Sequence, residues 1–295
     1  MLPTGEKYIN PLTDFGFKKL FGSEPNKDLL IDFLNQILPG PKVKDLTYSD
    51  KERPGRSQVD RSAIFDIFCT GPNGEHFIVE MQKAKQNYFK DRSLFYASYP
   101  IIEQGNDRDW NFKLNPVYAV GILDFTFKDG RKKEDGEVLH VVDLKDQNCE
   151  VFYDKLRFVY IELPHFKKSI DELATRLDKW LYVLRHLSRL NERPPALKER
   201  VFQKLFKAAK IASFSSEERD AYDYSLKVFR DLNNVVETAV DEGIKRGLKQ
   251  GLEQGLEQGA SAERKKIAQK MKQAGIPTEI IQQATGLSAT VINQL

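Results

Sequence analysis

Two carboxylates and one carboxamide have the spacing of a metal site. Asp66 interrupts the apolar segment 64–68. Glu80 follows the apolar residues 77–79, and Gln82 comes two positions later. A carboxylate among buried apolar side chains is costly unless it is paired or binds a cation, and oxygen ligands suit Mg²⁺ or Mn²⁺. These residues predict a divalent-cation site; the alternative is that they are solvated acids on an edge strand.

The segment that contains these residues is predicted to be a β-hairpin. Two runs rich in β-branched and aromatic residues, 60–70 and 75–82, flank the sequence Gly-Pro-Asn-Gly at 71–74. This composition is typical of two strands joined by a turn. On adjacent antiparallel strands the two acids can face each other, and side chains two residues apart share a face. The hairpin would therefore place both acids and the carboxamide together.

The first half of the chain has helical and strand patterns in alternation. A helix is expected to start at Thr13 or Asp14 and to end at Gly22. Further helices are expected over 27–38 and 88–102, and further strands over 43–48, 115–125, 137–142 and 158–163. Residues 1–163 therefore predict an α/β or α+β domain built on one mixed sheet.

From residue 164 onward only helical patterns remain. Helices are expected over 170–187, 197–211 and 217–241. We expect the chain to divide into an α/β domain (1–163), a helical subdomain (164–241), an arm or linker (242–264) and a small helical module (265–295). That last module has the order helix, turn, helix, turn, short helix. This order is typical of a DNA reader, but the module has Gln where a DNA-reading helix usually carries Arg or Lys. A small packing or dimer module is therefore an equal alternative.

Glycine recurs at every fourth residue from Gly243 to Gly259. Four residues turn a helix by slightly more than one revolution, so these glycines would form a slowly spiralling groove. Such a groove lets another helix approach closely, which favours self-association. Glycine also weakens a helix, so a flexible linker is the alternative.

Composition argues against several classes of protein. The net charge is only +3 although 30% of the residues are charged, so a histone-like electrostatic binder is not expected. No apolar run has the length of a membrane span, and no signal pattern begins the chain. The two cysteines and four histidines have no zinc-binding spacing. We expect a cytoplasmic protein without a membrane segment.

A series of segments resembles the recombination-promoting nuclease and transposase family, a branch of the PD-(D/E)XK nuclease superfamily. Each segment alone is a weak signal, but the ordered set covers nearly the whole chain. They are NPLTDFGFKKLFG at 10–22, the strand with Asp66, FIVEMQ at 77–82, RSLFY at 92–96, GILDF at 121–125, LDKWLY at 177–182 and the glycine-rich tail. The resemblance implies an α/β fold with a restriction-endonuclease-like core and a mixed central sheet, followed by an all-helical C-terminal region.

The resemblance also implies roles for individual residues. Asp66 and Glu80 would bind Mg²⁺, with Mn²⁺ or Ca²⁺ as alternatives, together with the carbonyl of Met81. Gln82 stands where the superfamily usually has lysine, a departure that is characteristic of this branch. An amide is neither a cationic acid nor a base, so it would orient water or phosphate. Asp14 aligns with an additional acid in some relatives. The alternative for Asp14 is a helical ion pair with Lys18, four residues later.

Basic residues after the second acid are candidates for holding the DNA backbone. They are Lys83, Lys85, Lys90 and Arg92. The alternative for these residues is a solvated helix face, with the DNA track at 51–56 or 131–133.

The resemblance implies a metal-dependent DNA endonuclease of low sequence specificity, linked to recombination or mobile DNA. Its expected partners are DNA and further copies of the chain, which would associate through the glycine-repeat helix. The alternative function is a catalytically weak DNA-binding or oligomeric regulatory protein that keeps the fold. The intact set of Asp66, Glu80 and Gln82 favours the first function.

Overall fold

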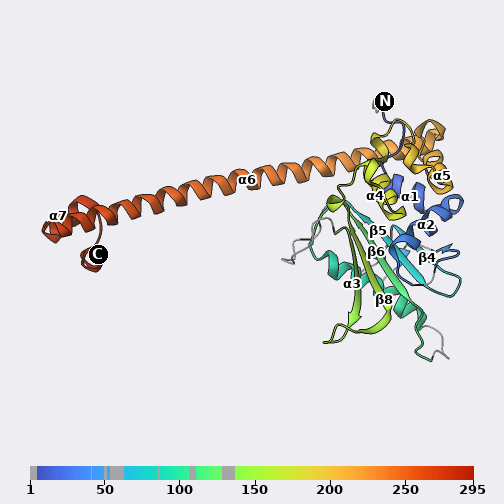
Figure 1. The fold of residues 1–295 in the computed structure, drawn as a ribbon, viewed down its shortest axis with the longest axis horizontal. Helices are drawn as coiled ribbons and strands as arrows, with labels where there is room; N and C mark the ends of the chain where they lie inside the picture. Colours follow the sequence, from blue (N-terminus) through green and yellow to red (C-terminus); the bar gives the residue numbers. More distant parts are fainter. Residues whose placement is uncertain are drawn as a thin grey trace. The chain divides into compact units, whose positions relative to one another are not determined.

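The computed structural model describes residues 5–40, 42–49, 52–53, 63–85, 87–105, 111–127 and 137–295 (Figure 1). The chain divides into two compact units, Met1–Leu232 and Asn233–Leu295. The first unit contains every residue of the predicted metal site.

A mixed sheet of six strands forms the centre of the first unit, with strand order β1-β4-β5-β6-β8-β7. The strands are β1 (Thr47–Tyr48), β4 (Ile67–Thr70), β5 (His76–Gln82), β6 (Val117–Leu123), β7 (Leu139–Lys145) and β8 (Val151–Glu162). β5, β6 and β8 are parallel, whereas β1, β4 and β7 join the sheet by antiparallel pairing. A separate antiparallel pair consists of β2 (Glu52–Arg53) and β3 (Ala63–Ile64). The predicted α/β fold class with a mixed central sheet is confirmed.

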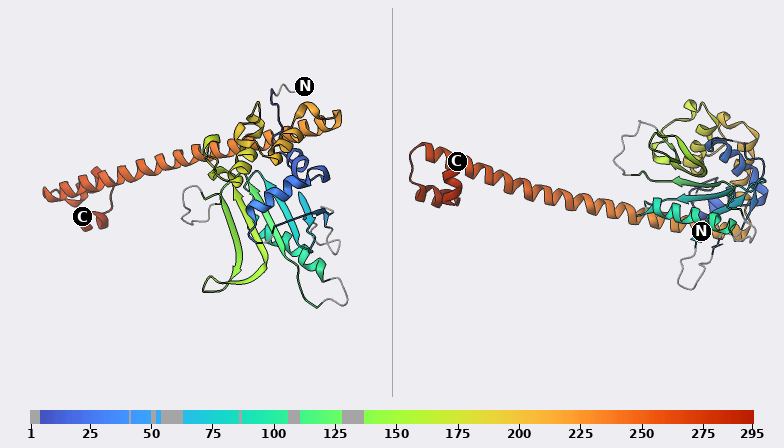
Figure 2. Two further views of the ribbon diagram at one scale, coloured as in Figure 1. Left: turned by 45° about the vertical axis from the view of Figure 1, so that its right-hand side comes forward. Right: turned by 90° about the horizontal axis from the view of Figure 1, so that it is seen from below.

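Helices cover both faces of this sheet (Figure 2). One face packs against α3 (Phe89–Gln104), where Phe89 and Ala97 meet Ala119 and Phe158. The other face packs against a larger helical layer. That layer consists of α1 (Asp14–Phe21), α2 (Lys27–Ile37), α4 (Arg176–His186), α5 (Arg200–Ala208) and the start of α6 (Ser216–Gln273).

The alternation of side chains along β5 decides where the second acid points. Phe77 and Val79 face the larger helical layer, and Ile78 faces α3. Because neighbouring side chains of a strand point to opposite faces, Glu80 shares the α3 face with Ile78. Both faces are buried, which explains the nearly continuous apolar run that precedes this acid.

The predicted hairpin joins β4 to β5. Gly74 in its turn has a φ of 83°, a conformation that glycine adopts without strain, and its N–H donates to the carbonyl of Gly71 at 3.0 Å. Ile67 pairs with Val79 in the antiparallel register. The next pair in that register is the two acids, so the turn sets their alignment.

Two element bounds differ from the sequence prediction for local reasons. The helix expected over 170–187 begins at Arg176, because Thr175 and Asp178 form a capping box at that point. The strand expected over 43–48 is reduced to β1, because both backbone groups of Val43 bond to the side chain of Asn35 in α2 instead. In both cases a polar side chain satisfies backbone groups that the predicted element would have used.

The strand expected over 158–163 is also longer in the structure. β8 begins at Val151 and forms a hairpin with β7, which extends the sheet beyond its central strands. The short 3₁₀ helices of the first unit are Glu24–Asn26, Leu163–His165, Ile170–Glu172, Leu187–Arg189, Pro195–Leu197 and Ile211–Ser213.

The second unit consists of the remainder of α6, then α7 (Thr278–Thr285) and α8 (Ala289–Gln294). α6 continues as a helix through the glycine repeat, because the Leu, Lys, Glu and Gln residues between the glycines are strong helix formers. Ala268, Ile281 and Ile292 form a small core between the three helices. The order helix, turn, helix, turn, short helix is confirmed, while the division into four domains stays a prediction.

None of the helices in the described part of the chain combines the length and the apolar content that a membrane span requires.

Candidate active site

Each of the two predicted acids accepts a hydrogen bond from the backbone of the opposite strand. The N–H of Asp66 donates to Oε1 of Glu80 at 3.1 Å. In return, the N–H of Met81 donates to Oδ2 of Asp66 at 2.8 Å. Asp66 lies in a bend just before β4, where regular backbone pairing is interrupted. The carboxylates therefore satisfy N–H groups that a regular ladder would have paired, and this exchange holds the acids together.

Burial and mutual repulsion make this acid pair costly when both groups are ionised. Glu80 is only 8% exposed. Burial, followed by the charge of Asp66, raises the pKa of Glu80 to about 8. Burial likewise raises the pKa of Asp66, although the hydrogen bond from Met81 favours its charged form. A cation bound between two such carboxylates would remove the repulsion.

Gln82 and Met81 add oxygen atoms to this cluster. Nε2 of Gln82 donates to Oε2 of Glu80 at 3.4 Å, so the carboxamide lies on the same face of β5. The N–H and C=O groups of one residue in an extended strand point to the same edge. The carbonyl of Met81 is therefore directed to the side of Asp66, as its N–H is.

This donor set fits a hard divalent cation. It offers two carboxylates, one backbone carbonyl and one carboxamide, which are all oxygen ligands of the kind that Mg²⁺ prefers. In the described part of the chain, no group of three or more His, Cys, Asp and Glu side chains is arranged to hold a metal ion. A cation at this site would thus depend on two carboxylates, backbone and water, which is a coordination that Mg²⁺ commonly accepts.

The N-terminal helix brings an ion pair to the edge of the site. Oδ1 of Asp14 and Nζ of Lys18 are 2.6 Å apart. The end of α1 lies against β4, since a Cβ atom on Gly22 would be 3.5 Å from Cγ1 of Ile67. Both charges act on Asp66: Lys18 lowers the pKa of Asp66, and Asp14 raises it. Lys18 is a candidate site residue that sequence analysis interpreted only as a helical partner.

Arg92 of α3 lies on the other side of the acid pair. Arg92 and Glu80 line a small cavity of about 10 Å³ together with Tyr96. The guanidinium carbon lies 5.4 Å from the ring centroid of Tyr96 and 5.3 Å from that of Phe89. Its positive charge lowers the pKa of Asp66 and Glu80. A cation held against two rings is therefore present beside the carboxylates.

The structure separates the three lysines that sequence analysis grouped with Arg92. Lys83 donates to the carbonyl of Phe229 and lies over its ring, so it connects the end of β5 to α6. Nζ of Lys90 is 4.7 Å from the ring centroid of Phe127, and Lys85 is exposed. The side chains of the basic segments 51–56 and 131–133 lie outside the described residues.

Gly121 is a residue of the site that sequence analysis missed. It pairs with Glu80 in the parallel register of β5 and β6. A Cβ atom at this position would lie 3.0 Å from Cδ1 of Tyr160 and 3.5 Å from Cζ of Phe89. The signal in the sequence is an isolated glycine inside a buried strand, which often marks a close approach.

Comparison with protein families places the whole acid cluster inside a matched range. The family model described as PD-(D/E)XK nuclease family transposase matches residues 11–239. No curated protein and no solved structure matches the chain in the corresponding comparisons. The matched range contains the central sheet, the helical layers on both faces and the reciprocal hydrogen bonds of the two acids. The chain therefore belongs to the PD-(D/E)XK nuclease family transposases.

Proposed function

We propose that this protein is a metal-dependent DNA endonuclease of low sequence specificity that acts in recombination or on mobile DNA. The main support is the reciprocal hydrogen bonding of Asp66 and Glu80, which holds one half-buried and one buried carboxylate beside Gln82. Membership of a nuclease-related family supports the same class of reaction. Basic side chains near the site suit phosphate groups, which carry no sequence information, so low specificity is expected.

Each residue of the cluster has a role in hydrolysing a phosphodiester. Asp66, Glu80 and the carbonyl of Met81 would hold Mg²⁺, Mn²⁺ or Ca²⁺. When bound, such an ion supplies positive charge for the scissile phosphate and favours ionisation of water. Gln82 neither gives nor takes a proton at neutral pH, so it orients water or phosphate by hydrogen bonding.

The cations around the acid pair would hold the DNA. Arg92 and Lys18 flank the carboxylates and can stabilise charge that develops on the phosphate. Lys85 is exposed three residues after the end of β5 and would contact the DNA backbone further along. Lys83 would act through its bond to Phe229, which fixes the strand end that carries Gln82.

A plasmid-nicking assay with Mg²⁺, Mn²⁺, Ca²⁺ or EDTA tests this proposal. Wild type is expected to nick with at least one cation and not with EDTA, and Asp66→Asn is expected to fail with all of them. Glu150→Gln, which changes an exposed acid next to β8, is the matched control and should nick as wild type does. DNA binding without cleavage under every condition would instead support the regulatory function.

Self-association through the glycine-repeat helix is part of the same proposal. A single site of this kind cuts one strand. A break in both strands therefore needs two sites or two successive visits, and a dimer supplies two sites at once.

A further inference from the structure

A continuous row of exposed apolar side chains follows α6 in the second unit. These side chains recur at every fourth residue and are 43% to 69% exposed. They are Val236, Val240, Ile244, Leu248, Leu252 and Leu256. A contiguous apolar surface of this kind on a folded protein usually marks an interaction site.

A second row, without side chains, runs beside the first. Each of Gly243, Gly247, Gly251 and Gly255 directly precedes a residue of the apolar row. A Cβ atom placed on any of them meets no described atom within 4 Å beyond the neighbouring backbone. Consecutive residues are about 100° apart around a helix, so the two rows are adjacent and have the same pitch. α6 thus carries a ridge of Ile and Leu next to a groove of glycine.

A ridge and a groove of equal pitch fit a second copy of the same helix. When two helices pack through their i±4 rows, the ridge of each enters a groove of the other and the axes cross at about −50°. If both helices point the same way, a two-fold axis between them sets each Leu row against the Gly row of the other copy. We infer that two copies of this chain pair in parallel through this surface, crossing near Gly251. This inference rests on the proposed self-association and specifies its geometry.

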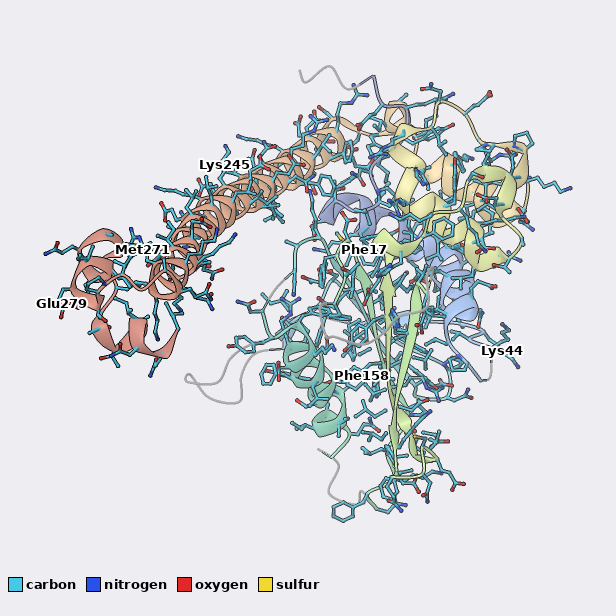
Figure 3. The ribbon with its side chains drawn as sticks, turned by 60° about the vertical axis from the view of Figure 1, so that its left-hand side comes forward. Phe17, Lys44, Phe158, Lys245, Met271 and Glu279 are labelled. Atoms are coloured by element: carbon cyan, nitrogen blue, oxygen red, sulfur yellow. The ribbon has the colours of Figure 1, made fainter. Side chains whose placement is uncertain are left out.

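The size of the surface agrees with this partner. Four turns from each copy would cover roughly 1,000 Å² in total, near the lower end of specific interfaces. The row after the apolar one carries four charged side chains, Lys245, Lys249, Glu253 and Glu257, and Figure 3 labels Lys245 on this helix. An antiparallel pair would bring the basic half of this row against the acidic half. Exposed ion pairs contribute little, however, and that orientation would set Leu against Leu and Gly against Gly.

Light scattering on the full-length chain tests the pairing. Wild type should have twice the chain mass of 34.0 kDa. Gly251→Leu fills the groove and favours helix formation, so it should be fully helical but monomeric. Leu248→Gln with Leu252→Gln removes the ridge with little change in helix propensity and should also be monomeric. Gln250→Leu adds a similar side chain outside both rows, about 160° around the helix from Leu248 and Leu252, and should remain dimeric.

The proposed pairing is wrong if wild type is monomeric. It is also wrong if Gly251→Leu and the double variant Leu248→Gln, Leu252→Gln both remain dimeric. The measurement needs neither DNA nor metal, so its outcome is independent of whether the protein cuts DNA.

Cross-linking tests the orientation in the same full-length chain. With Cys149, an exposed cysteine, replaced by Asn, the changes Gly247→Cys and Gly255→Cys are made in separate chains. A parallel pair predicts that each variant cross-links to itself. Cross-linking only after the two variants are mixed would overturn the parallel orientation.

Discussion

Asp66 and Glu80 put two carboxyl groups where a mixed sheet would otherwise bury apolar side chains. Their hydrogen bonds to the backbone of the opposite strand fix both carboxylates, but these bonds do not cancel the repulsion between them. Such an arrangement costs stability in the absence of a cation and is retained where function requires it. Two predictions at the residue scale follow from this conflict.

The first prediction separates catalysis from folding. In Asp66→Asn and Glu80→Gln an amide oxygen still accepts the backbone hydrogen bond, so both variants should fold. Metal-dependent nicking should fall on the order of a hundredfold or more, as when one group that stabilises transition-state charge is removed. Plasmid nicking and thermal melting by circular dichroism measure the two effects. Undiminished nicking by either folded variant would falsify the site assignment.

The second prediction concerns pH. The pKa of Glu80 is about 8 in the folded chain, against a reference value of 4.5. Between these values the folded state binds more protons than the unfolded state, so the free energy of unfolding falls as pH rises. In EDTA, the melting temperature of wild type should therefore fall as the pH is raised from the reference pKa to the folded-state pKa of Glu80. Glu80→Gln lacks this ionisation and should melt higher than wild type at the upper end.

A divalent cation should make wild type melt higher than Glu80→Gln. The cation stabilises the wild-type site, whereas the variant site lacks one of its ligands. If the melting temperatures of the two proteins run parallel at every pH, the raised pKa of Glu80 does not affect stability.

At the scale of elements, the end of β5 is held by a contact that its own sequence does not show. Lys83 and Lys85 look equivalent as basic residues after the second acid, yet Lys83 bonds to Phe229 in α6 and Lys85 is exposed. The two lysines should therefore respond differently to the same substitution.

The third prediction uses this difference. Lys83→Ala should reduce the free energy of unfolding by roughly 1–2 kcal/mol, because a hydrogen bond from a charged donor is lost. Lys85→Ala should leave stability unchanged and lower the salt dependence of DNA binding by about one unit of slope. Urea unfolding and binding titrations in a salt series measure the two quantities. Equal effects of both substitutions on either quantity would contradict the division of roles.

At the scale of the whole molecule, the proposed pairing through α6 would affect the product of the proposed cleavage. A dimer brings two sites to one duplex, whereas a monomer must bind again for the second cut. The proposed catalytic residues all lie in the first unit, so changes in the glycine row should not alter the chemistry of one site.

The fourth prediction is that Gly251→Leu nicks plasmid at the wild-type rate but gives several-fold less linear product early in the reaction. Gln250→Leu is the matched control and should give the wild-type ratio of linear to nicked plasmid. Gel analysis of early time points measures this ratio. An unchanged ratio for Gly251→Leu would show that double-strand cleavage does not need the pairing.

Local periodicity in the sequence was sufficient to predict the hairpin, the shared face of Glu80 and Gln82, and the row of glycines at every fourth residue of α6. These features depend on residues close together in the chain, where the repeat of a strand or a helix determines which side chains share a face. The central sheet and its mixed character followed in the same way from short apolar runs. The resemblance in the ordered motifs supplied the family, which the match over residues 11–239 confirms.

Other parts of the site required the tertiary structure. Lys18 lies beside Asp66 because α1 packs against β4, and Lys83 is bonded to a residue 146 positions away. Gly121 faces Glu80 only through the parallel register of two strands separated by a helix. Spacing along the chain carries no information about such neighbours, because they are set by how the helical layers pack on the sheet. The sequence thus determined which residues are the candidates for the chemistry, and packing determined which charges surround them.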